Sequence, residues 1–335
     1  MKLTRFSIYL ILAGLTLLGI GFSIGHFTIQ KKTNLTPAKP IRQANITYKY
    51  IDPLLAYDFP KANDITQYKV LSEKLEQLVT NAIQNKKAEN ISVYFKELQK
   101  GEWVGIHEND IYSPASLLKV PLMLAYLKIA ESKPETLHQN VLIKATSIDN
   151  VQNIKPTEHI EQGKTYTVAD LIKYMIAYSD NDAAAALRSI IDAKDVEDAY
   201  TDLGLKYPRN ELGDSMTVKN YALYFRLLYN ATYLDRDSSE SALKILSETD
   251  FTQGLVAGVP NTIVVAHKFG ERKIEKTNNT IQQQLHDCGI VYVPNRPYVL
   301  CVMTKGSDLH TLTDILHDIS KTTYEYEQNS IKTQQ

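Results

Sequence analysis

The order of apolar and polar residues predicts a helix followed by two strands in the first part of the globular chain. From 65 to 84, apolar residues such as Leu71, Leu75 and Val79 recur at the spacing of one helical face. The runs 91–95 and 103–106 are short and mostly apolar, and Lys100-Gly101 between them is a hairpin signal. We therefore expect a helix and then a pair of strands.

The end of the chain contains a second group of predicted strands, at 263–266, 289–293 and 298–303, followed by a helix from about Asp308. Between the two groups, an apolar helix begins near Ser116 and helical spacing continues to about Leu255. This order predicts an α/β (α+β) fold: an antiparallel sheet built from both ends of the domain, packed by the terminal helices, with an inserted all-helical lobe.

The segment before the globular domain has a different pattern. Residues 6–25 carry no charge and are flanked by basic residues, and about 20 apolar residues suffice for a helix to span a bilayer. A signal peptide has a shorter apolar stretch, so we favour an uncleaved anchor, although Ser23-Ile24-Gly25 fits a cleavage site. We expect an anchor or signal segment at 1–26, a linker at 27–64, the globular domain at 65–328 and a tail at 329–335.

Composition mainly excludes certain classes of protein and site. The 335 residues include 37 Lys+Arg and 38 Asp+Glu, a formal net charge of -1, so no excess of positive charge attracts nucleic acid. Two cysteines, Cys288 and Cys301, are too few for a disulfide scaffold or a four-ligand zinc site. Counted from the turn at 294–297, they lie on adjacent strands but not opposite each other, so we expect packing and not a disulfide.

A metal or another cofactor is not expected. His310, Asp314 and His317 fall on one face of the last predicted helix and have ligand chemistry. Two histidines and an aspartate on an exposed terminal helix are usually solvated, and we interpret them that way.

The first candidate for chemistry is Ser116, which stands three residues before Lys119 at the start of a helix. Positions i and i+3 share a helical face, so the amine can reach the hydroxyl. The helix N-terminus also favours negative charge on the serine oxygen. Ser241 and Lys244 have the same spacing and are interpreted as a solvated helix face, so spacing alone does not separate a nucleophile from a capping serine.

Two further motifs favour the interpretation of Ser116 as a nucleophile. Ser179-Asp180-Asn181 follows the apolar helix 168–177, and His267-Lys268-Phe269-Gly270 ends an apolar run. Taken singly, the first is a helix-capping turn and the second a strand ending in a glycine turn. In the order S-x-x-K, S-D-N and K-x-G, however, they resemble the serine β-lactamases and penicillin-binding proteins, most closely the class A β-lactamases. The resemblance covers roughly residues 66–325.

The resemblance implies a role for each motif residue. Ser116 corresponds to the acylated nucleophile and Lys119 to its general base, with the cation of Lys268 and burial lowering the pKa of Lys119. Ser179 corresponds to the proton relay to the leaving nitrogen. Asn181 holds Lys119 and the substrate amide.

The remaining substrate contacts also follow from the resemblance. Lys268 faces the substrate carboxylate, and Gly270 belongs to the same substrate-binding strand. The oxyanion hole is formed by the backbone N–H groups of Ser116 and Glu271. The free edge of 263–266 pairs with an extended substrate as an added strand.

Two departures from the family pattern bear on function. Phe269 stands where the family usually has a threonine or serine, so a carboxylate-binding hydroxyl is missing, and Arg272 is the nearby cation that can substitute for it. The family also places a deacylating glutamate in a loop after the S-D-N turn. Glu211 is the candidate here, but its surroundings lack the family's pattern, so a long-lived acyl-enzyme is expected.

The leading interpretation is a serine acyl-enzyme outside the cytoplasm that opens β-lactams, with a bearing on antibiotic resistance, or cleaves D-alanyl amides of peptidoglycan. The alternatives are a D,D-peptidase or esterase with little lactamase turnover, and a non-catalytic protein that binds β-lactams or peptidoglycan. The expected partners are the substrate and the membrane, with the chain a monomer. The expected location is the cell membrane, with the domain outside, or secretion after cleavage of the signal.

Overall fold

The computed structural model describes residues 40–42, 48–57, 68–145, 152–207, 215–275 and 280–332. All of them belong to one compact unit made of Lys39–Asp58 and Asp64–Gln335. The apolar segment expected at 1–26 lies outside the described residues. No helix in the described ranges combines the length and apolar character needed to cross a bilayer.

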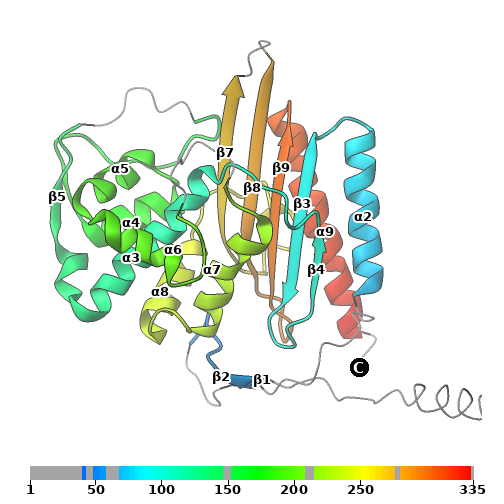
Figure 1. Ribbon diagram of the computed structural model, residues 1–335, viewed down its shortest axis with the longest axis horizontal. Helices are drawn as coiled ribbons and strands as arrows, with labels where there is room; N and C mark the ends of the chain where they lie inside the picture. The colour runs from blue at the N-terminus through cyan, green and yellow to red at the C-terminus, as the bar shows by residue number, and fades with distance from the viewer. Residues whose placement is uncertain are drawn as a thin grey trace, which may run out of the picture. The chain divides into compact units, whose positions relative to one another are not determined.

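A five-stranded sheet forms the centre of this unit, in the order β4-β3-β9-β8-β7 (Figure 1). The strands are β3 (Asn90–Glu97), β4 (Trp103–Ile106), β7 (Val265–Glu275), β8 (Ile281–Val291) and β9 (Tyr298–Gly306). Every neighbouring pair is antiparallel. The first two strands come from one end of the domain and the last three from the other, which confirms the predicted fold class.

Two helices cover one face of the sheet, α2 (Lys69–Gln84) and α9 (Leu309–Lys332) (Figure 1). Leu71, Leu75 and Val79 of α2 are buried, which is the apolar face that the spacing predicted. They share one hydrophobic core with the strands and α9. Helix α9 continues to Lys332, past the boundary expected at 328.

The inserted lobe is helical and packs on the other face of the sheet through α7 (Figure 1). Its helices are α3 (Lys119–Ser132), α4 (Val168–Ala177), α5 (Asn181–Ile190), α6 (Ala193–Thr201), α7 (Val218–Asn230) and α8 (Arg236–Leu246). It also contains β5 (Asn140–Leu142), paired with β6 (Thr165–Thr167), and the short 3-10 helices η1 (Ala115–Leu118) and η2 (Pro134–His138); η3 (Val256–Gly258) follows α8.

Helix α4 begins at a capping box, which explains why it starts where the sequence predicted. The Thr167 hydroxyl accepts from the Asp170 backbone N–H, and the Asp170 carboxylate accepts from the Thr167 N–H. This reciprocal pair satisfies two backbone donors at the helix end. Helix α4 ends at Ala177, and Tyr178 separates it from the S-D-N motif.

Part of the segment expected as a linker belongs to the folded unit. The strands β1 (Pro40–Arg42) and β2 (Leu54–Tyr57) pair with each other. Between them, Tyr50 and Ile51 are buried in the core of the helical lobe. The Glu240 carboxylate accepts from the backbone N–H groups of 49–51. A backbone tied down by a buried tyrosine and a carboxylate does not behave as a free linker.

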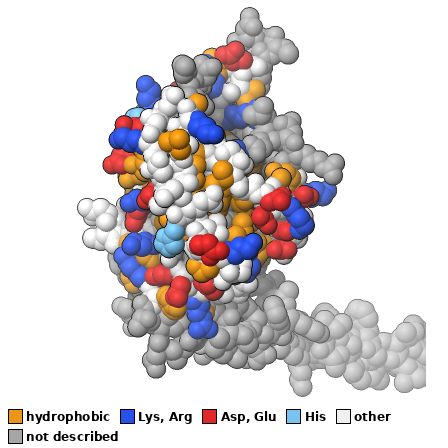
Figure 2. Space-filling model, turned by 90° about the vertical axis from the view of Figure 1, so that its left-hand side faces the viewer, with side chains coloured by type: hydrophobic (Ala, Val, Ile, Leu, Met, Phe, Trp, Pro, Cys, Tyr) orange, Lys and Arg blue, Asp and Glu red, His pale blue; other side chains and the backbone are white. Residues whose placement is uncertain are grey.

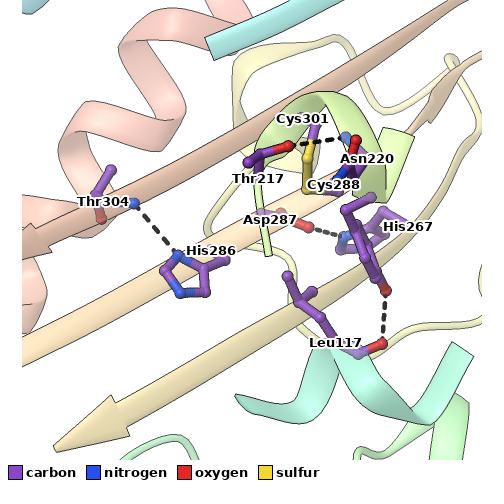
Figure 3. The surroundings of a disulfide bond; sticks show 10 residues. Leu117, Thr217, Asn220, His267, His286, Asp287, Cys288, Cys301 and Thr304 are labelled. Carbon is purple, nitrogen blue, oxygen red and sulfur yellow. Dashed lines mark hydrogen bonds and ion pairs between the residues drawn. A yellow bond between two sulfur atoms is a disulfide. The ribbon is translucent and has the colours of Figure 1, made fainter. Parts of the chain in front are cut away.

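The expectation for the cysteines is wrong, because the two are directly opposed. Val291 pairs with Tyr298, so the β8–β9 connection takes six residues, 292–297, and shifts the register by two from the one we expected. Cys288 therefore faces Cys301 and the two form a disulfide (Figure 3). The sulfurs lie in the core between the sheet and the helical lobe.

Replacing both cysteines by alanine is expected to lower the free energy of unfolding by about 2–4 kcal/mol, because the disulfide restricts the unfolded chain. Urea unfolding of the wild type with and without a reductant checks this. The reductant should lower the midpoint of the wild type and leave the midpoint of Cys288→Ala/Cys301→Ala unchanged. Equal stability of the oxidised wild type and the double variant would contradict the prediction.

On α9, His310 is exposed and His317 is partly exposed, and each is paired with a neighbouring carboxylate. His310 Nδ1 lies 3.3 Å from Asp314, and His317 Nδ1 lies 3.0 Å from Asp318. Across the described ranges, no group of three or more His, Cys, Asp or Glu side chains is arranged to hold a metal ion.

Candidate active site

Ser116 lies on η1, directly before α3, and is half-buried. The preceding residue, Ala115, has a φ of 49°, a left-handed conformation that is uncommon for a residue with a side chain. Tyr221 from α7 donates to the Leu117 carbonyl at 2.9 Å and holds η1 in place. Strain of this kind persists where the surrounding structure fixes the backbone, and here it sets the position of the serine.

Lys119 is the first residue of α3, and its side chain is buried at 4 % exposure. Its Nζ donates to the Ser179 carbonyl at 2.7 Å, to Ser179 Oγ at 3.2 Å and to Asn181 Oδ1 at 2.6 Å. The S-x-x-K and S-D-N motifs therefore meet, although 60 residues separate Lys119 from Ser179. A direct hydrogen bond from Lys119 to Ser116 Oγ, which the spacing suggested, is not present among the described residues.

The S-D-N turn serves both as a helix cap and as part of the site. Asp180 is the N-cap of α5, and its carboxylate accepts from the backbone N–H groups of Asp182 and Ala183. Ser179 has a φ of 54°, a second left-handed residue at the site. The capping interpretation is correct for Asp180, while the residues on either side of it contact Lys119.

The electrostatics of the site favour a neutral Lys119. Burial and, second to it, the cation of Lys268 hold the pKa of Lys119 well below its usual range. An amine acts as a base only when it has lost its proton, so both effects increase the reactive fraction near neutral pH. The direction agrees with the sequence-based expectation.

Lys268 on β7 is fully buried, and burial lowers its pKa to about 7 against the opposing charges of Asp287 and Asp250. Its Nζ donates to the Phe269 carbonyl at 3.1 Å and lies 4.2 Å from the centroid of the Phe269 ring. Burying an ammonium that has one hydrogen bond lowers the free energy of unfolding. The same ammonium is well suited to pair with an anion.

Lys268→Met is expected to stabilise the protein, because it removes a buried charge while keeping the side-chain volume. The native state binds fewer protons than the unfolded state between about pH 7 and the usual lysine pKa, so the cost of Lys268 falls as the pH rises through that window. The gain is expected to be about 1–4 kcal/mol, or several degrees in Tm, at pH 6 and smaller at pH 9.

Thermal unfolding of both proteins at pH 6 and pH 9 checks this. Lys273→Met is the matched control, since Lys273 lies on the same strand with an exposed side chain. It should change Tm little at either pH. A lower Tm for Lys268→Met at pH 6 would contradict the prediction.

A buried histidine-carboxylate pair lies behind Lys268, and sequence reasoning did not identify it as a pair. His267 Nδ1 is 2.7 Å from Asp287 Oδ1 (Figure 3). The other Asp287 oxygen accepts from the Leu255 N–H at 2.9 Å. The charge of Asp287 raises the pKa of Lys268 against burial. The signal was an acidic residue in the second half of β8, where the residues are mostly apolar.

The strand β7 differs from the predicted 263–266, since it begins at Val265 and continues through the K-x-G motif to Glu275. The motif is thus inside a strand and does not end one. The second half of β7 is polar, and an edge strand tolerates polar residues. A search for apolar runs therefore does not detect this half of the strand. The part of the sheet edge beside Ser116 is therefore at 268–272.

Gly270 permits close approach between β7 and the serine. An added Cβ there would lie 3.0 Å from the Pro114 carbonyl oxygen and 3.2 Å from the Leu117 nitrogen, within η1 and the residue before it. Phe269 points to the other face of the sheet, where its ring packs 4.5 Å from that of Phe251. Phenylalanine therefore completes the core where the family usually has a hydroxyl.

Arg272 and Glu271 have partners that the sequence did not predict. Nη1 of Arg272 donates to Ser113 Oγ at 2.7 Å, in the segment that leads to Ser116. The Glu271 carboxylate accepts from Asn153 Nδ2 at 2.8 Å and from the Ile154 N–H at 2.7 Å. No pattern in the polar segment around 153 signalled this contact.

The structure tests the prediction for the second serine-lysine pair but not the one for the glutamate. Ser241 and Lys244 are both exposed on α8, which confirms the interpretation as a solvated face. Glu211 lies outside the described residues.

A cavity of about 540 Å³ is lined by residues of β5 and α5. Leu142, Asp182 and Ile190 are among its lining residues. Figure 2 shows this side of the lobe, with hydrophobic side chains near the middle of the face and charged ones around its rim. None of the predicted site residues lines this cavity.

Two solved structures show to which class of fold this chain belongs. The TLA-3 extended-spectrum β-lactamase superposes with a TM-score of 0.66 at 18 % identity, over 76 % of this chain and 98 % of that one. PBP-A superposes with a TM-score of 0.62 at 20 % identity, over 78 % and 97 %. The fold is that of the β-lactamases and penicillin-binding proteins.

Sequence comparison then gives the family. The model described as the β-lactamase enzyme family matches residues 71–327. The β-lactamase VEB-1 of Pseudomonas aeruginosa is 24 % identical over 239 residues, which cover 65 % of this chain and 79 % of VEB-1. The chain belongs to the β-lactamase enzyme family.

Proposed function

We propose that this enzyme reacts with β-lactams through an acyl-enzyme on Ser116 that is released slowly. The observation that carries the proposal is the buried amine of Lys119, which stands three residues after Ser116. Ser179 and Asn181 accept hydrogen bonds from this amine. Neutral Lys119 takes the proton of Ser116 as its oxygen bonds to the lactam carbonyl carbon. The C–N bond of the ring then breaks, and the proton passes from Lys119 through Ser179 to the nitrogen.

The supporting groups have defined tasks in this scheme. The backbone N–H groups of Ser116 and Glu271 stabilise the oxyanion that forms on the carbonyl oxygen. Lys268, a buried cation with one hydrogen bond, pairs with the substrate carboxylate. Substrate binding thus gives the Lys268 ammonium a direct ionic partner in addition to its one hydrogen bond.

Slow release follows from the lack of an identified base for water. Glu211 is the sequence candidate for this base, and its surroundings lack the family's pattern. A positioned base contributes about 10²–10⁴-fold to such a step. A variant of PBP-A, which shares the fold, has been solved as an acyl-enzyme complex with penicillin G.

Hydrolysis of a chromogenic cephalosporin is expected to show a burst equal to the enzyme concentration, followed by a slow steady state, because acylation outruns deacylation. Stopped-flow absorbance measures both phases. A linear course with fast turnover and no trapped adduct would contradict slow release. It would direct attention to Glu211 as the base.

A second candidate is a D,D-peptidase or esterase acting on D-alanyl ends. The observation that favours it is that Glu211 lacks the sequence pattern of the family's deacylating glutamate, since an enzyme without that base has little lactamase turnover. Release of D-alanine from a D-alanyl-D-alanine peptide, measured beside cephalosporin hydrolysis, distinguishes the two. The assembled Ser-Lys site and the family membership do not favour the non-catalytic alternative.

We also propose that the domain acts outside the cytoplasm as a monomer, attached through the apolar segment 6–25. The disulfide between Cys288 and Cys301 supports this location, since disulfides persist in oxidising compartments. Protease accessibility in intact cells tests the orientation. Membrane fractionation distinguishes an anchored from a secreted protein, and light scattering gives the oligomeric state.

A further inference from the structure

A buried histidine on β8, His286, contacts the chain shortly before the catalytic serine. Its Nε2 lies 2.9 Å from the carbonyl oxygen of Ser113, three residues ahead of Ser116. Its Nδ1 accepts from the backbone N–H of Thr304 on β9 at 3.3 Å (Figure 3). A carbonyl only accepts and a backbone N–H only donates, so a neutral imidazole with its proton on Nε2 satisfies both contacts. His286 therefore donates to Ser113, and β9 fixes the orientation of its ring.

The register of the sheet explains why His286 reaches this segment. His286 is the cross-strand partner of Gly270, so both residues face the same side of the sheet. The chain approaches the sheet closely at Gly270, where an added Cβ would lie 3.0 Å from the Pro114 carbonyl oxygen. The imidazole on the neighbouring strand meets the same stretch of chain one residue earlier, at Ser113.

Ser113 is fully buried, and side chains from the sheet bind each of its polar groups. Gln284 Oε1 accepts from its backbone N–H at 3.1 Å, His286 donates to its carbonyl, and Arg272 Nη1 donates to its hydroxyl at 2.7 Å. Gln284 and His286 are themselves buried. A buried carbonyl that loses its donor costs free energy unless the backbone moves toward another partner. Removing the donor at His286 is therefore expected to displace the backbone at Ser113.

Such a displacement is close enough to affect the reacting atoms. Two residues separate Ser113 from Ser116, and the second of them, Ala115, has the left-handed φ of 49°. His286 supports the chain before the serine, as the Tyr221 hydroxyl supports η1 after it. A misplacement of about 1 Å in a reacting group can slow a reaction by about 10²-fold.

We propose that His286 is a positioning residue for acylation: by donating to the Ser113 carbonyl, it holds Ser116 Oγ and the Ser116 N–H in place for attack on the lactam carbonyl. This inference rests on the proposed function and concerns the same site. His286 acts through the backbone, whereas Lys268 binds the substrate carboxylate in the proposed scheme. Loss of the contact should therefore lower the maximal acylation rate and leave the affinity of the noncovalent complex nearly unchanged.

Two variants separate the contact to Ser113 from the rest of the imidazole. A glutamine places an amide donor near the position of Nε2, and an asparagine places an acceptor near the position of Nδ1. His286→Gln therefore keeps the bond to Ser113, while His286→Asn keeps only the bond to Thr304. Acylation of the full-length protein by benzylpenicillin is followed by rapid quenching and intact mass over a range of concentrations, which gives the maximal rate and the dissociation constant separately.

The maximal rate of His286→Gln should stay within about threefold of the wild type, and that of His286→Asn should fall about 10–10²-fold. The dissociation constant should change less than about threefold in both. Rates are expressed per active site from the adduct formed at completion, so a misfolded fraction changes the amplitude and not the rate. Gln282→Ala is the matched control on the same strand, since Gln282 donates to Glu89, and it should react as the wild type does.

Two results would overturn this inference alone. A wild-type rate per active site in His286→Asn would show that the contact does not position the serine. An equal loss of rate in His286→Gln and His286→Asn would assign the effect to packing of the imidazole and not to the bond with Ser113. Absence of acylation in the wild type would overturn the inference together with the proposed function.

Discussion

Ser116→Ala is expected to lose acylation by benzylpenicillin, with the rate falling by at least about 10³-fold, because the substitution removes the only atom that forms the covalent bond. The fold should be retained, since Ser116 Oγ makes no hydrogen bond within the described residues. Intact mass after incubation with excess penicillin measures the adduct, and circular dichroism confirms folding.

Ser241→Ala is the control for this experiment. Ser241 has the same spacing to a lysine but is exposed on α8. Its variant should be acylated at the wild-type rate. Adduct formation at the wild-type rate in Ser116→Ala would remove Ser116 from the mechanism.

Lys119→Ala is expected to slow acylation by about 10²–10⁴-fold, the usual contribution of a positioned general base. Lys119→Arg should not restore the rate, because a guanidinium stays protonated in proteins. Lys244→Ala, on the exposed face of α8, is the control and should react normally. Wild-type acylation by Lys119→Ala would show that another group takes the serine proton.

The pH dependence gives an independent check on Lys119. Its neutral form reacts, so the acylation rate should rise with pH through a pKa well below the usual lysine range. The cation of Lys268 lowers that pKa, so Lys268→Met should move the rising limb to higher pH. Because Lys268→Met also weakens substrate binding, the position of the limb, not the height of the profile, is the readout. A shift to lower pH would contradict the assigned electrostatics.

The architecture could be predicted from the sequence because it depends on local patterns. The apolar face of α2 and the hairpin β3–β4 follow from spacing, and the position of α4 follows from a run of apolar residues that begins after a capping threonine. The register of β8 and β9 could not be predicted. The register depends on the number of residues in the connection at 292–297. That number places Cys288 opposite Cys301 and so allows the disulfide.

The site was predicted in its residues but not in its contacts. Order along the chain identified Ser116, Lys119 and Ser179, yet the left-handed backbone at Ala115 and Ser179 has no sequence signature. The contact between Glu271 and Asn153 joins residues 118 positions apart, and neither lies in a motif for that contact. Lys268 is fully buried, which sets it apart from a surface cation. Its burial could not be predicted, because it depends on where the strand lies in the sheet.

The most direct test of the serine acyl-enzyme is peptide mapping of the wild-type protein after reaction with a fluorescent penicillin. The label should correspond to one intact penicillin per chain and should map to the peptide that contains Ser116, bound as an ester to its hydroxyl. No covalent label, or a label on a peptide without Ser116, would contradict the account.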